Sequence, residues 1–322
     1  MLLTDKPVPG PPRDYVGYGR RRPRVVWPGN AKVAVVLVLN YEEGSEYSWP
    51  AGDGHGEALA EIPYIINSQY RDLGSESSYE YGSRAGIWRL MQMFDDYKVQ
   101  VTFHACAVAI ERNREVGQWI QESGHEPCSH GWRWSEHWLL DREEEKQRIQ
   151  WAVESIEKTC GERPLGWYSR YSPSISTREL LVEEGGFLYD SDSYADDIPY
   201  FVQVSGKQHL VVPYTLSYSD ARFVRPQGYS NPDDFFETLR QGLDEYWREG
   251  DAGYPKMMSV QLHARWAGQA NRAAGLRKFI EYALAKDGVW ITKRIDIARW
   301  WLAHHKEFES ESSDRAATSS RR

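Results

Sequence analysis

Short runs of apolar residues recur along the chain and predict strands that are buried on both faces. The first run, residues 32–40 (KVAVVLVLN), is almost continuously apolar. Such a run is typical of a strand in a parallel sheet that is covered on both sides. We expect further strands over residues 100–106, up to 129, 166–168, 186–190, 210–213, 257–263 and 289–292.

Between these runs, apolar positions recur with the spacing of a helix. In residues 84–97, Ile87, Leu90 and Phe94 share one face, as the helical period of 3.6 residues requires. We expect further helices over residues 111–123, 141–159, from 177, 232–249, 271–286 and 295–304. Strands that alternate with crossover helices indicate a parallel sheet, and seven or eight of them are typical of a single α/β barrel.

The two ends of the chain lack both patterns. Residues 1–30 are rich in Pro, Gly and Arg and have too few apolar positions to fold alone, so we expect an extended arm that is either disordered or wrapped on the barrel or on a neighbouring subunit. Residues 307–322 are rich in Ser, Glu and Arg, which predicts a disordered tail. The barrel itself is therefore expected over residues 31–306.

The composition of the chain limits which partners it can bind and in which compartment it is expected. The chain has 322 residues and a formal net charge of -8, which argues against nucleic acid, since a phosphate backbone needs a basic surface. Its beginning has no apolar stretch of signal-peptide length, and no run approaches the ~20 apolar residues of a membrane span. The three cysteines have no paired spacing, as expected in a reducing compartment. We therefore expect a cytoplasmic protein that binds neither nucleic acid nor membrane.

Two adjacent carboxylates, Glu42 and Glu43, directly follow the first expected strand. Buried carboxylates are costly unless they are paired. In the functional interpretation, one glutamate activates water as a general base while its neighbour binds a metal or an orienting residue. In the structural alternative, one glutamate faces water and the other pairs with an arginine.

Other chemically capable residues follow later strands. His130 and His263 each lie at the end of an expected strand, where a histidine can act as acid, base or ligand, or can be a hydrogen-bonded loop residue. Arg170 follows residues 166–168 and can hold a carboxylate or ureido oxygen or form a structural salt bridge. An acidic loop spans residues 189–194. Because the carboxyl ends of barrel strands share one rim, we expect these residues to meet there.

This ordered set of segments resembles the NodB-type polysaccharide deacetylase superfamily and, within it, the bacterial allantoinase branch. The resemblance covers nearly the whole chain and rests on the segments PRDYVGYG, NYEEG, SYEYGSRAG, SHGWRW, GERPLGWY, EEGGFLYDSDSY, VPYTL and LHAR. It implies a deformed seven- or eight-stranded NodB-type barrel. It also implies a hydrolase that opens a C–N bond in a small cyclic amide, such as allantoin or a related ureide or imide, as in purine catabolism.

The sequence departs from the metal-dependent members of that superfamily. Those deacetylases carry paired Asp in the first motif, the first as base and the second as metal ligand, where this chain has Glu42 and Glu43. They also carry two metal-binding histidines four residues apart. In this chain the residue four positions after His130 is Trp134, which cannot bind a metal. A zinc site normally needs three protein ligands and a water. The resemblance to the allantoinase branch therefore implies activity without a metal cofactor.

One residue favours a metal site instead. His104 lies near the end of the second expected strand, where it could rebuild a site for a divalent metal such as zinc together with Glu43 and His130. In the alternative interpretation, His104 is a buried imidazole that is bonded to a backbone carbonyl.

The resulting hypothesis is that water attacks a cyclic amide carbonyl. Glu42 takes the proton of the water, with its pKa kept up by the neighbouring Glu43, and His130 or His263 donates a proton to the leaving nitrogen. The alternatives are a metal-dependent deacetylase of chitin or peptidoglycan, a cyclic imidase with another substrate, and an inactive barrel that binds a partner.

Substrate binding is assigned to planar and aromatic groups. Arg170 and Arg265 are expected to grip the substrate and its developing oxyanion. Trp134 and Tyr168 are expected to line the site, because flat faces suit a planar ring.

The arm favours an oligomer. Its Tyr15, Tyr18 and Trp27 are aromatic anchors of the kind that dominate interfaces, and we expect them to dock on a neighbouring copy. Together with the family resemblance, this indicates a homo-oligomer, expected to be a tetramer.

Overall fold

The computed structural model describes residues 6, 8–58, 61–62, 66–226 and 228–319. Its strands are β1 (Val33–Tyr41), β2 (Thr102–Ala105), β3 (Glu126–Ser129), β4 (Gly166–Trp167), β5 (Tyr189–Asp190), β6 (Tyr200–Val204), β7 (Lys207–Val211), β8 (Lys256–His263) and β9 (Val289–Thr292). Its α-helices are α1 (Leu73–Tyr81), α2 (Ile87–Tyr97), α3 (Ala107–Arg112), α4 (Arg114–Glu122), α5 (Arg142–Cys160), α6 (Thr177–Glu184), α7 (Pro232–Asp251), α8 (Ala270–Ala285) and α9 (Arg294–Ser319). Shorter helical turns are η1 (Pro28–Asn30), η2 (Trp49–Ala51), the π-helical η3 (Gly82–Gly86), η4 (His137–Leu139) and η5 (Asp220–Phe223).

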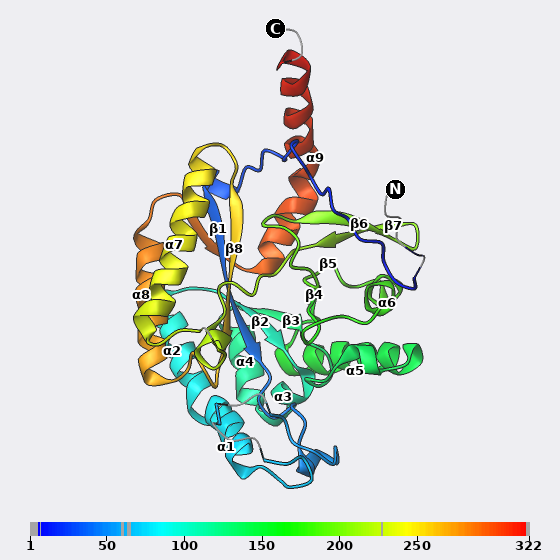
Figure 1. Ribbon diagram of the computed structural model, residues 1–322, viewed down its shortest axis with the longest axis vertical. Coiled ribbons are helices and arrows are strands. Elements are labelled where there is room, and N and C mark those ends of the chain that lie inside the picture. The colour runs from blue at the N-terminus through cyan, green and yellow to red at the C-terminus, as the bar shows by residue number, and fades with distance from the viewer. Residues whose placement is uncertain (1–5, 7, 59–60, 63–65, 227, 320–322) are drawn as a thin grey trace.

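The strands form one curled sheet in the order β6-β7-β5-β4-β3-β2-β1-β8, and β9 pairs with β1 beside that path. The pairs are parallel except for β6 with β7, which are antiparallel. Helices α2, α7 and α8 lie along one side of the sheet, and α5 lies across from them (Figure 1). The predicted α/β fold, a deformed NodB-type barrel, is confirmed, and its wall is an open half-barrel.

Strand β1 is the centre of the sheet. All nine of its residues are buried, and their side chains alternate between two core clusters, with Val33, Val35 and Leu37 in one and Ala34 and Val36 in the other. Strand β8 pairs with β1 along most of its length. Strand β9 pairs with the first half of β1, and β2 pairs with the second half of β1. Because both faces are covered, the whole strand can be apolar, which explains why its pattern is so clear in the sequence.

Several elements differ from the sequence prediction, among them α1, which precedes the helix expected over residues 84–97 and was not predicted. The expected strand over residues 210–213 overlaps β7, the second half of a hairpin of β6 and β7, and β6 is a partly exposed edge strand that was not predicted. The expected helix over residues 111–123 is divided into α3 and α4 at Asn113, whose φ of -133° and ψ of 77° are not helical.

The arm docks on its own barrel. Trp27 is 1% exposed and donates a hydrogen bond from Nε1 to the backbone oxygen of Lys256 at 3.0 Å. The hydroxyl of Tyr18 donates to the backbone oxygen of Pro199 at 2.9 Å. Tyr15, in contrast, is 70% exposed. The prediction that Tyr18 and Trp27 dock on a neighbouring copy is therefore corrected, because contacts within the chain satisfy both side chains.

Helix α9 continues through most of the segment that composition predicts as a disordered tail. It ends at Ser319, and its last turns project away from the rest of the molecule (Figure 1). Phe308 is buried, with its ring centroid 5.5 Å from that of Trp301. Glu, Ala and Arg in this segment have good helix propensity, which agrees with a helix in a segment whose composition also predicts disorder. Among the described residues, no helix is long and apolar enough to cross a membrane.

Candidate active site

The carboxyl ends of the parallel strands surround a cavity of about 140 Å³. Glu42 after β1, His130 after β3 and His263 at the end of β8 line its floor, and all three side chains are buried. These residues were expected to meet at one rim, and the structure brings them together there, because parallel strands end at the same edge of a sheet.

Glu42 is the central carboxylate of the cavity. Its Oε1 lies 3.4 Å from Nε2 of His130 and 3.6 Å from Nε2 of His263. Its Oε2 lies 2.8 Å from Nη2 of Arg265, in an ion pair without the direction of a hydrogen bond. Burial opposes the charge on Glu42, yet Arg265 and His263 lower its pKa to about 2. The prediction that Glu43 keeps the pKa of Glu42 up is wrong, because the Arg265 cation is in direct contact.

Glu43 lies behind the cavity wall. Its Oε2 accepts a hydrogen bond from the backbone N–H of Glu42 at 3.1 Å, and its Oε1 accepts one from the backbone N–H of Arg265 at 3.0 Å. Burial raises the pKa of Glu43 above its ordinary value, while the Arg265 guanidinium opposes that rise. Glu43 is thus placed to hold Arg265 and the loop after β1 in position, and it has no contact with the cavity.

The π-helical turn η3 packs a glycine face against these residues. A Cβ on Gly82 would lie 2.5 Å from Oε1 of Glu43, and a Cβ on Gly86 would lie 2.0 Å from the backbone oxygen of Ala264. Both approaches are too close for any other side chain. The spacing of these glycines in the segment SYEYGSRAG therefore allows the helix to close over Glu43.

His130 is held in one orientation. Its Nδ1 lies 2.7 Å from the backbone oxygen of Tyr168, and a carbonyl only accepts, so Nδ1 carries the hydrogen. The imidazole also stacks on the Tyr168 ring, with centroids 5.2 Å apart and planes 11° from parallel. Nε2 of His130 is therefore the atom that faces Glu42.

His263 is oriented by a carboxylate that the sequence analysis missed. Nδ1 of His263 lies 2.7 Å from Oδ1 of Asp220, which is fully buried. The other oxygen of Asp220 accepts hydrogen bonds from the backbone N–H groups of His263 at 2.7 Å and Ala267 at 3.0 Å. Asp220 opens η5 in a connection without strand or helix periodicity, so no pattern in the sequence marks it as a partner of His263.

Trp134 lines the cavity between two arginines that lie behind the wall. The guanidinium carbon of Arg170 is 3.9 Å from the centroid of Trp134, and that of Arg265 is 5.3 Å away. Arg170 also donates to the backbone oxygen of Trp134 and to Glu57, each at 2.7 Å. The prediction that Arg170 and Arg265 grip the substrate is corrected, because buried partners hold both guanidinium groups away from the cavity lining.

The acidic loop after β5 is structural. Asp190 pairs with Nε of Arg178 at 2.6 Å and with Nε2 of His209 at 3.0 Å. Asp192 accepts hydrogen bonds from the backbone N–H of Ser169 at 2.7 Å and from its hydroxyl at 2.8 Å. These contacts fix the loop that carries Arg170, and neither aspartate lines the cavity.

The aromatic walls include two tyrosines that the sequence analysis did not assign to binding. Tyr168, which it did assign, donates its hydroxyl proton to the Tyr194 hydroxyl at 2.8 Å, and Tyr194 donates to the backbone oxygen of Tyr171 at 3.0 Å. Tyr171 has a φ of 56°, a left-handed conformation that costs energy for a residue other than glycine. The surrounding contacts thus force Tyr171 into a position on the cavity wall.

The residues do not fit a metal centre of the kind that metal-dependent deacetylases require. The alternative ligand set was Glu43, His104 and His130, but Glu43 faces Arg265, and Nδ1 of His104 donates to Oδ1 of Asn40 at 3.0 Å. Among the described residues, no group of three or more His, Cys, Asp or Glu side chains is arranged to hold a metal ion. The guanidinium of Arg265 neutralises the carboxylates and would repel a dication.

The position of His104 agrees better with the alternative interpretation, in which it is a buried, hydrogen-bonded imidazole. It is fully buried, stacks on Tyr168 with centroids 4.7 Å apart, and burial lowers its pKa well below the usual value. Its hydrogen-bond acceptor is the side-chain amide of Asn40, however, and not a backbone carbonyl. His104 is therefore a neutral imidazole within the barrel.

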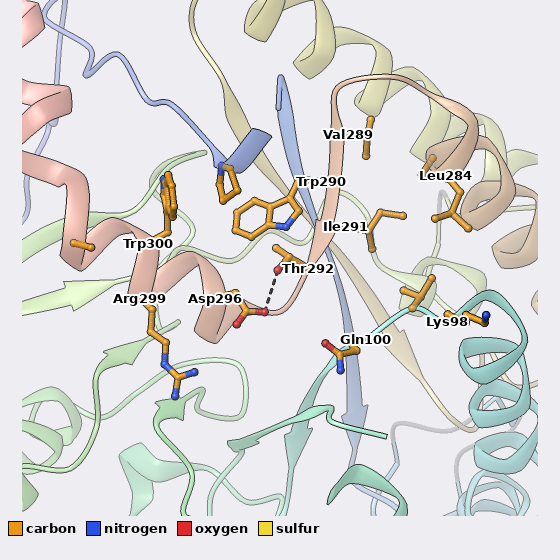
Figure 2. Close-up of a pocket in the computed structure, with 14 residues that line it drawn as sticks. Lys98, Gln100, Leu284, Val289, Trp290, Ile291, Thr292, Asp296, Arg299 and Trp300 are labelled. Atoms are coloured by element: carbon orange, nitrogen blue, oxygen red, sulfur yellow. Dashed lines mark hydrogen bonds between the residues drawn. The ribbon is translucent and has the colours of Figure 1, made fainter. Parts of the chain in front are cut away.

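A larger cavity, about 840 Å³, opens at the opposite end of the strands. Figure 2 shows Trp290 and Ile291 of β9 and Asp296, Arg299 and Trp300 of α9 on its walls. Asp296 accepts a hydrogen bond from the Thr292 hydroxyl at 3.0 Å, and the described residues that line this cavity include no acid–base pair like that of Glu42 and His263. A choice of the active site by cavity volume alone would therefore fall on the wrong end of the barrel.

Comparisons with known proteins agree with the fold and the site. The family model for polysaccharide deacetylase matches residues 76–183. A Schizosaccharomyces pombe protein assigned to the polysaccharide deacetylases is 37% identical over 87% of this chain and 93% of its own length. The crystal structure of a protein from Pseudomonas aeruginosa PAO1, described as a probable polysaccharide deacetylase, has a TM-score of 0.87 and 44% identity over 91% of this chain and 99% of its own. That of PuuE allantoinase has a TM-score of 0.87 and 45% identity over 91% and 98%.

A parallel half-barrel with a carboxylate between two histidines at the carboxyl ends of its strands defines a hydrolase of the NodB-type superfamily. Within that class, this chain belongs to the polysaccharide deacetylase family, as its similarity over almost the full length of the yeast relative shows. The resemblance found in the sequence is confirmed, including the close structural similarity to an allantoinase.

Proposed function

We propose that the protein hydrolyses the C–N bond of a small cyclic amide, namely allantoin or a related ureide or imide. The observation that carries the proposal is the size and lining of the cavity above Glu42. A volume of about 140 Å³ suits a single small ring, since a cavity of ~150 Å³ holds benzene. The aromatic walls suit a planar ring, whereas a sugar polymer needs an extended groove.

In the proposed reaction, water attacks the ring carbonyl and Glu42 receives the proton. With a pKa of about 2, Glu42 is ionised at neutral pH and is ready to accept a hydrogen bond from the water. Such a carboxylate is a weak base, so its main contribution is to orient the water and to accept its proton late in the attack.

We assign the proton donor of this reaction to His263 rather than His130. The imidazolium of His263 would face the carboxylate of Asp220 at 2.7 Å, whereas that of His130 would face a neutral carbonyl. A carboxylate partner stabilises the charged imidazole more strongly. His263 can then protonate the leaving nitrogen from Nε2 as the ring C–N bond breaks, and His130 lies on the other side of Glu42 to position the substrate.

We propose that Arg265 takes over the role of a metal in this site. It supplies the positive charge beside Glu42 and Glu43 that an ion would otherwise supply. The support comes from its burial and from Trp134, which occupies the position of the missing histidine ligand.

A second candidate is deacetylation of chitin or peptidoglycan. It is favoured by the family model and by the names of the yeast and Pseudomonas relatives. The allantoinase neighbour, at similar identity, favours ring opening, and the small cavity decides our preference.

Side-by-side kinetics on allantoin, succinimide, dihydrouracil and acetylated chitin oligomers tests the proposal. We expect turnover of at least one ring and no release of acetate from the oligomers. Release of acetate without ring opening would establish the second candidate instead. Loss of that release with a chelator would further contradict the proposed role of Arg265.

A further inference from the structure

The charge of the cavity changes from its floor to its mouth. On the floor, the carboxylate of Glu42 is compensated by Arg265 behind it and lies between two histidines. Among the described residues that line the cavity, the remaining formally charged side chains are Arg222 and Arg225. Both are cations, in a chain whose net charge is -8.

Exposure shows which lining residues lie at the mouth. Glu42 and His130 are each 2% exposed, whereas Leu216 is 52% and Tyr194 is 46% exposed. Arg225 belongs to the exposed set and Arg222 is half-buried. A ring whose scissile bond lies at Glu42 therefore directs its substituent toward Tyr194, Leu216 and the two arginines.

Arg222 is rigidly linked to the proposed proton donor. It lies in η5 two residues after Asp220, which holds His263 at 2.7 Å. Its guanidinium carbon is 4.9 Å from the ring centroid of Tyr229, and its Nη1 donates to the backbone oxygen of Ser217 at 3.4 Å. A group that Arg222 binds is thus kept at a fixed place relative to His263, as positioning requires.

We infer that the substrate is a cyclic amide that carries a carboxylate or another anionic substituent, which Arg222 and Arg225 bind at the mouth of the cavity. This inference rests on the proposed ring-opening function and names its substrate class. A guanidinium binds a carboxylate through two parallel charge-assisted hydrogen bonds. In a protein whose net charge is -8, the two cations at the mouth favour the entry of an anion there.

The test compares substrates that differ by one carboxylate. Hydantoin is paired with 5-carboxymethylhydantoin, and dihydrouracil with dihydroorotate. We expect a higher kcat/KM for the anionic member of at least one pair. Arg222→Gln and Arg225→Gln should each reduce that preference about 10- to 100-fold, the effect of losing one charged hydrogen-bonding partner. Arg222→Lys and Arg225→Lys should retain part of it.

Arg248→Gln is the matched control, because Arg248 is an exposed arginine of α7 that does not line the cavity. It should leave the preference unchanged. Added salt should reduce the preference of the wild type, since exposed charges are screened. Equal kcat/KM values within both pairs, with no change in either Gln variant, would overturn the inference while leaving ring opening established.

Binding separates failure of the inference from failure of the proposed function. The same pairs are titrated into the Glu42→Gln variant, and quenching of the fluorescence of Trp134 and Trp266 in the cavity wall reports the affinity. Tighter binding of the anionic member, lost on addition of Arg225→Gln, supports the inference even if no ring is opened by the wild type. Equal affinities for the two members of each pair would overturn it.

Discussion

Arg265 determines how the central glutamate behaves. A carboxylate as deeply buried as Glu42 would normally be protonated more readily, because burial disfavours charge. Contact with Arg265 reverses that tendency and lowers the pKa of Glu42 to about 2. The same cation contacts Glu43, so one side chain stabilises two buried carboxylates.

Glu42→Gln should abolish turnover with little change of fold. The amide keeps the volume of the side chain but cannot accept a proton from water, so we expect a loss of about 10²-fold or more in kcat. Steady-state kinetics on the substrate found in the panel measures it. Glu46→Gln is the control, since Glu46 is buried in the same loop but does not line the cavity. Activity near wild type in Glu42→Gln would refute its role.

Arg265→Gln should change the pH dependence of activity. The base must be ionised, so activity is lost as pH falls through the pKa of Glu42, which is about 2 in the wild type. Without Arg265, burial raises that pKa, and an acid limb should enter the accessible range of kcat/KM against pH. Breaking a buried ion pair also costs about 3–5 kcal/mol of unfolding free energy, measured by urea denaturation. Arg265→Lys should retain much of the wild-type pH dependence and much of the free energy of unfolding. An unchanged pH dependence of kcat/KM in Arg265→Gln would contradict the proposed effect of Arg265 on Glu42.

Trp134→His should not create a zinc site. The substitution restores the missing ligand type, but the Arg265 cation still lies against both carboxylates and repels a dication. We expect elemental analysis to find less than stoichiometric metal in the wild type and in this variant. Near one metal per chain in the purified wild type, with activity lost to a chelator, would contradict the prediction and make the metal part of the site.

At the scale of elements, His125 links the N-terminal ends of β2 and β3. Its Nδ1 accepts a hydrogen bond from the backbone N–H of Val101 at 3.0 Å, so a proton on Nδ1 would break that bond. Its ring lies among Phe103 and Trp119, with centroids 5.7 and 4.1 Å away. Burial, and then the charge of Lys293, lower the pKa of His125 to about 3.

His125 should therefore make stability depend on pH. Between the usual histidine pKa of about 6.5 and its own of about 3, the unfolded chain binds one proton more than the folded chain. The free energy of unfolding should fall as pH falls, by about 1.4 kcal/mol per pH unit from this residue. His125→Gln should reduce the slope in urea denaturation between pH 6 and 4. His304→Gln, on the surface of α9, should not, and identical slopes in all three proteins would contradict the prediction.

Periodicity predicted the elements whose burial is one-sided or complete, and missed the others. Strand β1 and helix α5 were found because their apolar positions follow the geometry of the core. Strand β6 was missed although Tyr200, Phe201 and Val202 form a short apolar run, because this edge strand pairs antiparallel with β7 and lies outside the alternation of parallel strands and helices. In the site, strand order predicted the meeting of Glu42, His130 and His263. It could not predict Asp220, nor that Arg265 turns to buried partners, because both depend on contacts between distant segments.

At the scale of the whole molecule, the exposed part of the arm is the clearest candidate for contact between copies. Tyr15 is 70% and Val16 is 76% exposed, while Tyr18 and Trp27 are held by the barrel. An arm that is fixed at one end and apolar at its surface can bury those residues on a second copy.

Light scattering at micromolar concentration should therefore report a homo-oligomer, and we expect a tetramer. The double variant Tyr15→Ser and Val16→Ser should weaken assembly without unfolding the barrel, since neither side chain is part of the core. A deletion through Trp27 would be a poor test, because Trp27 is buried in the fold. A monomeric wild type would refute the prediction, and an unchanged assembly in the double variant would show that the arm is not involved.

The pairing of β1 has a consequence for synthesis of the chain. Strand β1 is made early, yet its partners β8 and β9 lie about 220 residues or more further along. At about 5–20 residues per second, a ribosome needs roughly 10 to 45 s to reach the end of β8. For that time the most apolar strand of the protein has no partner along one edge, which is an aggregation hazard. Successful folding in the cell therefore depends on protection of the nascent chain until its last quarter has emerged.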